Sequence, residues 1–370
     1  MIIGIDASNI RQGGGVTHLL EILLNFNESV HVNISKVIVW APGTTLLKLP
    51  DFPWLIKDEQ RLLNGNIFLR SYWQSAHLGR LANSNNIDVL FSLCNNCIKG
   101  IDTVLICHSH LPLERKEINR YPWGLARLRL EILRIKFIKS YTKAKGIIFL
   151  TNASMTLVSS LVDISQKKCE VIPHGFNKEL FEPKDLSSKT DEYVKLVYVS
   201  ILEPYKHQLE VLQAVNLLIE EGYKLQLYLI GSKMHLETSR VNSFLALHGH
   251  IKDEVHLLGD IPYEKLNEYY RNADIFVYAS TCESFGIILL EAMASKLPIA
   301  CSDIASLTET LRDGGIYFNA EDPKSIKEAL KLYLDNNNLR TECSIKAYDY
   351  SKGYSWKVCS LRTFQFLESI

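Results

Sequence analysis

Short runs of β-branched and other apolar residues alternate along the chain with longer stretches whose apolar positions recur at helical spacing. In the first half the expected strands are residues 2–5, 37–40, 87–91, 103–107, 146–150 and 169–172. A second series follows a polar break, at residues 196–200, 225–230, 255–258, 274–279 and 298–302. Strands that alternate with helices in this way predict parallel sheets covered by helices. The pattern therefore predicts two doubly wound α/β units laid end to end.

The polar, turn-rich segment that begins at His174 separates the two series and is the expected hinge. We place a first domain at residues 1–173, a second at 174–350, and a C-terminal helix at 351–370. This helix is a candidate to pack back on the first domain. A length of 370 residues also exceeds what one hydrophobic core usually supports. Ligands of such sheets bind beyond the carboxyl ends of the strands, so we expect the site in a cleft between the domains.

The composition is that of an ordinary globular protein, with 47% hydrophobic and 22% charged residues. No apolar run approaches the ~20 residues that span a bilayer. The chain opens directly on an expected strand, so we expect no signal peptide and a cytoplasmic location, with the inner face of the membrane as a candidate site. Eight cysteines are too few for a disulfide scaffold. Cys94 and Cys97 form a C-x-x-C without a second pair, so we expect no metal site and no cofactor.

Charge is unevenly spread although the net charge is zero. Residues 1–173 hold 20 Lys and Arg against 13 Asp and Glu, so the two halves carry +7 and −7. Seven basic residues lie in 123–145, which suits an anionic membrane surface or a phosphate-bearing acceptor. The alternative is a core helix with a solvated basic face, because Leu125, Leu128, Ile132 and Ile135 recur at helical spacing. We favour the core helix, and both interpretations can hold together.

A glycine-rich loop, RQGGGVT at residues 11–17, follows the first strand and opens a helix at about Thr17. Glycines let the backbone approach an anion, and a helix start supplies free N–H groups. Gly14 and Gly15 are therefore candidates for holding phosphate. The spacing is not that of the dinucleotide fingerprint, and the loop alone is a weak signal.

Two strand-to-helix connections in the second half carry the strongest candidates. In SILEPYKH, residues 200–207, Lys206 stands near a helix start, where a cation complements a diphosphate. Glu283 follows the strand DIFVYAS, and Gly286 lies at the next helix start. Glu291 falls eight residues after Glu283 in an otherwise apolar helix. Burial of an unpaired carboxylate is costly, so we expect a hydroxyl-rich partner such as a ribose, or else an arginine from elsewhere in the fold.

These residues carry a resemblance. Glu283 and Glu291, with Phe285 and Gly286 between them, resemble the E-x7-E motif of the family 4 retaining glycosyltransferases, which have the two-domain GT-B fold. SILEPYKH is similar to the family segment VGTLEPRKN, and VIPHGFNKELF to its IPNGVD segment. The resemblance covers nearly the whole C-terminal half and is weaker in the first half.

The resemblance implies a role for each matching position. Glu283 would contact the donor sugar, Glu291 the ribose, and Lys206 the diphosphate. The amides of residues 285–287 (Phe285, Gly286 and Ile287) would hold the distal phosphate. Gly14 and Gly15 would close on the same phosphates from the other domain. His108 matches the cleft histidine of the family.

Two features depart from the family pattern or leave a choice open. Tyr205 stands where an arginine often precedes the lysine, and His110 competes with His108 for one role. We treat His174, His248 and His250 as structural or exposed.

The resemblance implies metal-independent, retaining transfer of a hexose from a GDP- or UDP-linked sugar to a hydroxyl of a glycan or lipid-linked acceptor. Surface polysaccharide synthesis is the expected setting, with no nucleic-acid partner and with peripheral membrane contact through residues 123–145. Three alternatives stay open: a nucleotide-sugar epimerase, a sugar phosphorylase, and a non-catalytic nucleotide-sugar-binding subunit. A phosphorylase would need a pyridoxal-binding lysine context, which the sequence does not provide. An epimerase would convert the donor without any acceptor, and a non-catalytic binding subunit would leave the donor intact.

Overall fold

The computed structural model describes residues 1–183, 192–232 and 235–370. Contacts divide the chain into two compact units, which we describe separately. Unit 1 comprises residues 1–118, 123–175 and 354–370, and unit 2 comprises residues 119–122 and 176–353. Part of the segment expected to be the hinge, residues 184–191, lies outside the described residues.

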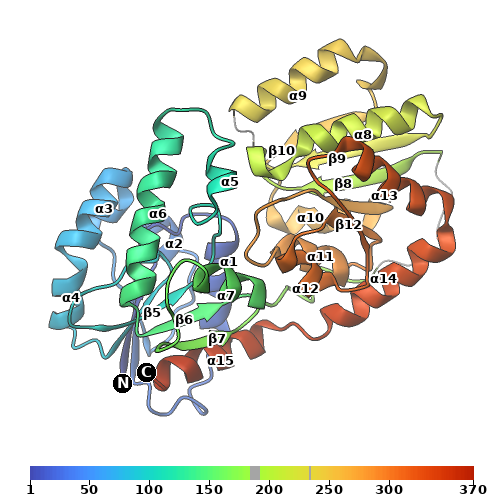
Figure 1. Ribbon diagram of the computed structural model, residues 1–370. Coiled ribbons are helices and arrows are strands. Elements are labelled where there is room, and N and C mark those ends of the chain that lie inside the picture. The colour runs from blue at the N-terminus through green and yellow to red at the C-terminus, as the bar shows by residue number, and fades with distance from the viewer. Residues whose placement is uncertain (184–191, 233–234) are drawn as a thin grey trace. The chain divides into compact units, whose positions relative to one another are not determined.

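Unit 1 (Figure 1) is built on a seven-stranded parallel sheet. Its strand order is β3-β2-β1-β4-β5-β6-β7. Its strands are β1 (Ile2–Asp6), β2 (Lys36–Trp40), β3 (Leu55–Lys57), β4 (Val89–Ser92), β5 (Asp102–Ile106), β6 (Gly146–Phe149) and β7 (Lys168–Val171). Its helices are α1 (Gly14–Leu24), α2 (Gly43–Leu46), α3 (Ile67–Ala76), α4 (Leu78–Ser84), α5 (Arg115–Ile118), α6 (Leu125–Lys143), α7 (Asn152–Ser159) and α15 (Trp356–Glu368). The strands β1, β4, β5 and β6 are almost entirely buried, as expected of a parallel sheet covered on both faces.

Unit 2 repeats this plan with six parallel strands in the order β10-β9-β8-β11-β12-β13. Its strands are β8 (Val194–Val199), β9 (Leu225–Ile230), β10 (Val255–Gly259), β11 (Ile275–Tyr278), β12 (Ile299–Ser302) and β13 (Ile316–Phe318). Its helices are α8 (Gln208–Glu220), α9 (His235–Leu247), α10 (Tyr263–Asn272), α11 (Ile287–Ala294), α12 (Ala305–Leu311), α13 (Pro323–Asp335) and α14 (Asn337–Ser351). In both units the strand order reverses beside the first strand, at β1/β4 and at β8/β11. Ligands of such sheets bind beyond the strand ends at this point.

The C-terminal helix α15 packs on α1 within unit 1. The Ser360 hydroxyl donates a hydrogen bond to the carbonyl of Ile22 (2.7 Å), and Glu368 pairs with His31 (2.8 Å). Gly175 allows the chain to pass directly against the start of α15, because a Cβ there would lie 2.1 Å from the backbone nitrogen of Trp356. These contacts make residues 354–370 part of the core of unit 1.

Candidate functional site

The reversal point of the unit 2 sheet brings two predicted residues together. Lys206 follows β8 in a short 3-10 turn (Pro204–Lys206), and Glu283 follows β11. The Lys206 ammonium donates a hydrogen bond to Oε1 of Glu283. Both side chains are largely buried, with 9% and 15% of their surfaces exposed. The carboxyl ends of neighbouring strands thus present a cation and a carboxylate that can each contact a polar ligand.

The two strand ends are also tied together through their backbones. The Thr281 amide donates to the carbonyl of Tyr205 (2.9 Å), and the Thr281 hydroxyl lies 3.2 Å from Nε2 of His207. The Lys206 ammonium sits 5.0 Å from the ring centre of Tyr205, within the range of a cation–π contact. Tyr205, which stands where the resemblance leads us to expect an arginine, therefore helps to hold the lysine. The sequence analysis assigned no role to Thr281 or to His207, although His207 is the last residue of the SILEPYKH segment.

Gly286 sets the turn between Glu283 and α11. Its φ of +84° lies in the left-handed region, and an added Cβ would lie 2.9 Å from Cδ2 of Leu307. The Phe285 side chain is buried and anchors the same turn. Phe285, Gly286 and Ile287 thus lie at the start of α11, where the first N–H groups of a helix lack intrahelical acceptors. This geometry suits an anion, and their contact with phosphate stays a prediction.

Glu291 lies in the middle of α11 and is 2% exposed. The hydroxyl of Tyr263 donates to its Oε1 (2.9 Å) and that of Tyr270 to its Oε2 (3.2 Å). Burial raises the pKa of Glu291 to about 7, and the two tyrosine hydroxyls oppose this shift. Tyrosine hydroxyls are therefore the protein partners of this carboxylate, where the sequence suggested a ribose or an arginine. Tyr263 and Tyr270 stand seven residues apart on α10, a helical spacing that could have indicated a shared face.

The predicted glycines lie in unit 1. The helix α1 begins at Gly14, three residues before the predicted start at Thr17. Gly13 caps the helix with a φ of 68°, because glycine reaches the left-handed region without strain. Gly14 is exposed and Gly15 half-buried. The two residues lie at a helix N-terminus, and their role toward phosphate stays a prediction.

The histidines after β5 differ in their surroundings. His110 is buried, with Nε2 2.8 Å from the Ser154 hydroxyl and Nδ1 3.6 Å from Glu114. His108 is half-buried, and its Nε2 lies 3.1 Å from Nδ1 of His18. Burial lowers the pKa of His108 to about 4, so the imidazole is neutral near pH 7. The contacts of His110 are those of a structural residue, which leaves His108 as the candidate for a ligand.

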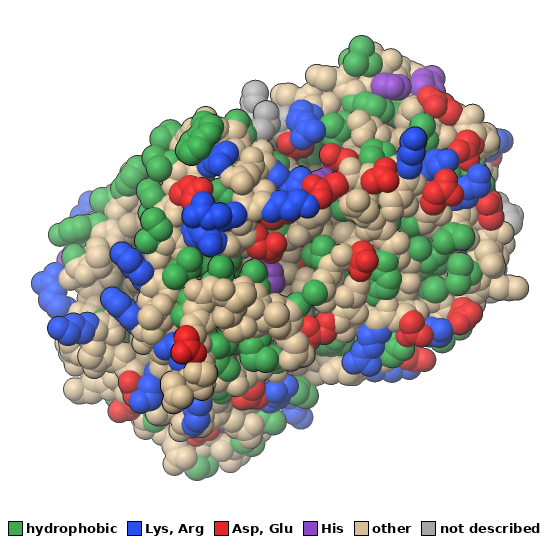
Figure 2. All heavy atoms as spheres, viewed as in Figure 1, with side chains coloured by type: hydrophobic (Ala, Val, Ile, Leu, Met, Phe, Trp, Pro, Cys, Tyr) green, Lys and Arg blue, Asp and Glu red, His purple; other side chains and the backbone are tan. Residues whose placement is uncertain are grey.

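The basic stretch forms α6, and the face of this helix that is buried differs from the one that the sequence predicted. Leu125, Leu128, Ile132 and Ile135 are 54–87% exposed, whereas Leu130, Phe137 and Tyr141 face the core. The interpretation that buried the first four residues is therefore wrong. Apolar positions at helical spacing mark one stripe of a helix but do not say what covers it. In Figure 2, hydrophobic and basic side chains lie next to each other over this part of unit 1.

The two cysteines of the C-x-x-C are free thiols. The Asn9 amide donates to the sulfur of Cys94 (3.3 Å), and burial raises the pKa of Cys97 to about 11. A protonated thiol is a poor nucleophile, so the surroundings do not activate this pair.

Among the described residues, no helix is long and apolar enough to cross a membrane.

Comparison with known families accounts for both units. A model described as Glycosyltransferase Family 4 matches residues 12–180, and one described as Glycosyl transferases group 1 matches residues 177–350. The chain belongs to the family 4, group 1 glycosyltransferases. Within this family its two parallel-sheet, Rossmann-like domains constitute the GT-B fold. The predicted family and fold are thereby confirmed.

Individual relatives are more distant. The chain is 30% identical over 167 residues to an O-antigen chain mannosyltransferase B of Escherichia coli, a match that covers 45% of this chain and 44% of that protein. Among solved structures, sucrose-phosphate synthase from Thermosynechococcus elongatus is 17% identical, with a TM-score of 0.76 over 100% of this chain and 98% of that one. Anabaena Alr3699/HepE in complex with UDP and glucose is 16% identical, with a TM-score of 0.74 over 100% and 99%. At these identities the structural likeness shows the fold alone.

Proposed function

We propose that this chain is a retaining glycosyltransferase that moves a hexose from a GDP- or UDP-linked sugar to a hydroxyl of a glycan or lipid-linked acceptor. The observation that carries the proposal is the Lys206–Glu283 pair at the ends of β8 and β11, beside the start of α11 at Gly286. The family supports a nucleotide-sugar donor, as does the UDP in the HepE complex. The E. coli relative supports surface polysaccharide as the setting and mannose as the first sugar to test.

Each group in unit 2 has one task in this proposal. Lys206 supplies the cation for the diphosphate, and the amides of residues 285–287 bind its distal phosphate. Glu283 accepts hydrogen bonds from the donor sugar, and Glu291 accepts them from the ribose. Without donor, Lys206 and Glu283 satisfy one another, which limits the cost of holding two charges in a largely buried place. Gly14, Gly15 and His108 of unit 1 are proposed to serve the same reaction.

The chemistry needs stabilisation of a departing diphosphate. The bond from the anomeric carbon to the phosphate oxygen breaks with its electron pair on the phosphate. The acceptor hydroxyl oxygen bonds to that carbon on the same face, and its proton passes to the leaving phosphate. Lys206 and the helix amides can stabilise the charge that develops on this oxygen, which is the function usually given to a divalent ion. The proposed transfer is therefore independent of metal.

Membrane contact through α6 is part of the proposal. Leu125 of α6 is 87% exposed, and Trp123, two residues before it, is 79% exposed. The exposed basic residues Arg129, Lys139 and Lys143 lie on α6. Exposed apolar and basic side chains on one helix suit the surface of an anionic bilayer. A glycolipid acceptor would be held at such a surface.

The test combines binding, turnover and stereochemistry. In a thermal-shift screen of GDP- and UDP-linked hexoses, a donor at 100 times its Kd should add about 2.7 kcal/mol to the free energy of unfolding. Proton NMR of the first-formed product should then show the anomeric configuration of the donor. An inverted product would refute retention. Conversion of the donor sugar without any acceptor would indicate an epimerase, and a bound donor that stays intact with every acceptor would indicate a non-catalytic subunit.

A further inference from the structure

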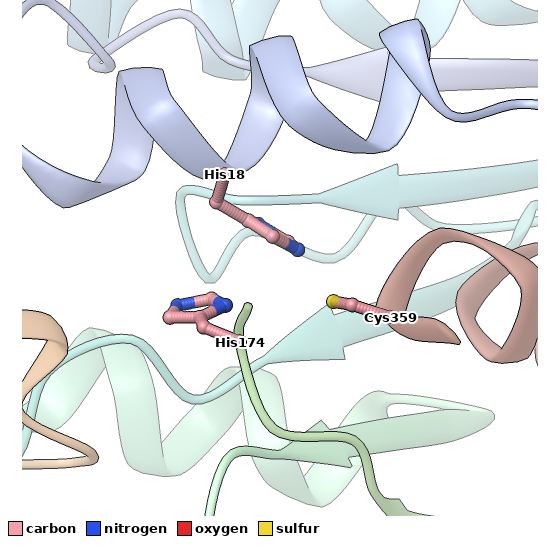
Figure 3. A group of neighbouring side chains, drawn as sticks. All are labelled: His18, His174 and Cys359. Atoms are coloured by element: carbon pink, nitrogen blue, oxygen red, sulfur yellow. The ribbon is translucent and has the colours of Figure 1, made fainter. Parts of the chain in front are cut away.

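Three side chains that the sequence keeps far apart meet inside unit 1 (Figure 3). His18 comes from α1, His174 from the segment after β7, and Cys359 from α15. They are 0%, 5% and 2% exposed. One nitrogen of each imidazole and the sulfur all lie within 4.8 Å of one another. Imidazole nitrogen and thiolate sulfur are the preferred ligands of zinc.

His18 is oriented for such a role by its neighbour. Its Nδ1 lies 3.1 Å from Nε2 of His108, and within the described structure its buried Nε2 has no hydrogen-bond partner. In Figure 3 the ring nitrogen of His18 that lies farther from the backbone points toward Cys359. A buried polar nitrogen without a partner costs free energy. A hydrogen bond to the other ring nitrogen is the usual way in which a metal-binding histidine is held in place.

The two imidazoles can accept a cation as they stand, whereas the thiol must lose its proton. Burial lowers the pKa of both His18 and His174 well below its usual range, so both imidazoles are neutral near pH 7 and keep a lone pair. Burial raises the pKa of the Cys359 thiol to about 12. The thiol is therefore protonated without a metal, and a bound cation would displace that proton.

The fold holds the three segments together before any ion binds. The Ser360 hydroxyl of α15 donates a hydrogen bond to the carbonyl of Ile22 in α1. Gly175, the residue after His174, lies directly against the backbone of Trp356. In a tetrahedral zinc site with ligand distances of about 2.1 and 2.3 Å, the ligand atoms lie roughly 3.4 to 3.6 Å apart. The widest separation in the cluster, up to 4.8 Å, must therefore shorten by about 1 Å. Rotations of the side chains can supply a change of this size.

We propose that His18, His174 and Cys359 form a binding site for one thiophilic divalent cation of the zinc type, which cross-links α1, the segment after β7 and α15. Three protein ligands leave a fourth position for water. The site belongs to unit 1, whereas Lys206, Glu283 and Glu291 belong to unit 2. The proposal does not depend on the proposed sugar transfer.

The test uses Co²⁺ as a probe, because Co²⁺ bound to thiolate absorbs in a charge-transfer band. Full-length protein stripped with a chelator should bind one equivalent of Co²⁺ with this band and release protons. Added Zn²⁺ should remove the band. Cys359→Ser should abolish the band, and His18→Gln should weaken Co²⁺ binding at least tenfold. Cys343→Ser, which changes a buried cysteine of unit 2, is the matched control and should behave like the parent.

The parent titration decides the question even if a variant fails to fold. A parent protein that shows no thiolate band with one equivalent of Co²⁺ would overturn the proposal, and so would a folded Cys359→Ser protein that keeps the band. Thermal unfolding gives a second readout, because Zn²⁺ should raise the Tm of the parent and leave that of Cys359→Ser unchanged. Equal Zn²⁺ shifts in both proteins would likewise contradict the site.

Discussion

Replacement of Glu291 by glutamine should stabilise the protein at alkaline pH while it weakens nucleotide binding. Glu291 is fully buried, and its pKa is raised by burial to about 7 from an ordinary 4.5. Between these two values the native carboxyl keeps a proton that the unfolded chain has lost. Stability is therefore lost as the pH rises from about 4.5 to about 7. Above pH 7 the free energy of unfolding is lower by roughly 3 kcal/mol, because a pKa difference of one unit is worth about 1.4 kcal/mol.

Glutamine removes this loss because it carries no charge, while its carbonyl can still accept the hydrogen bond from Tyr263. Chemical denaturation of Glu291→Gln and parent should give the same free energy of unfolding near pH 5. At pH 8 the variant should be more stable by up to roughly 3 kcal/mol, or about 6 to 12 °C in Tm. Glu268→Gln, at an exposed position of α10, is the control and should stay within about 0.5 kcal/mol of the parent at both pH values.

Nucleotide binding should move in the opposite direction. Hydroxyls of a bound ribose favour the ionised carboxylate, so binding should release a proton and the affinity of the parent should rise between pH 6 and 8. The variant should bind about ten- to a hundredfold more weakly at pH 8, with little dependence on pH. Isothermal titration calorimetry in buffers of different ionisation enthalpy measures both quantities. A variant that is no more stable at pH 8 and binds nucleotide as tightly as the parent would refute the reasoning, and Glu291 would then be a structural partner of the tyrosines.

Four further outcomes are expected. Glu283→Gln should lower kcat by on the order of a hundredfold with nucleotide affinity largely kept, and near-normal turnover would remove it from the reaction. Lys206→Ala should weaken binding of the nucleoside diphosphate by roughly 1.5 to 3 kcal/mol, whereas Lys224→Ala at an exposed site should not; equal affinities in calorimetry would exclude Lys206. Transfer measured well below the Tm should survive excess EDTA, and a loss restored by Mg²⁺ or Mn²⁺ would contradict metal independence. Charge reversal at Arg129, Lys139 and Lys143 should weaken the free energy of binding to anionic vesicles by about 1 kcal/mol per charge, measured by cosedimentation. If the parent does not bind the vesicles, α6 does not have this role. Arg134 is unsuitable for that test, because it bonds to the carbonyl of Leu113.

The sequence predicted most of the fold because buried parallel strands read as continuous apolar runs. It missed β3 and β13, which have three residues each and are too short to show a pattern. The predicted start of α1 was late, since the glycines that open the helix have low helical propensity. The strand-end residues Lys206 and Glu283 were identified by their local motifs, and the structure brings them together.

What the sequence left out depends on contacts between distant segments. Tyr263 and Tyr270 reach Glu291 from a neighbouring helix, and no motif links them to it. Cys359 meets His18 only because α15 packs on α1. The side of α6 that faces the core was likewise undetermined, because periodicity does not reveal what a stripe packs against. Local motifs therefore identified the candidate site residues, but not the side chains from distant segments that contact them.

The packing of α15 on α1 has a consequence for the order of folding during synthesis. Unit 1 is discontinuous in sequence, because residues 354–370 complete a core that begins at residue 1. During translation the N-terminal segments leave the ribosome while α15 is still unmade, whereas unit 2 ends at residue 353 and can finish earlier. Until α15 arrives, the apolar side of α1 that it covers stays exposed to solvent and to chaperones. Unit 1, although it comes first in the sequence, therefore cannot complete its native core before α15 has been made.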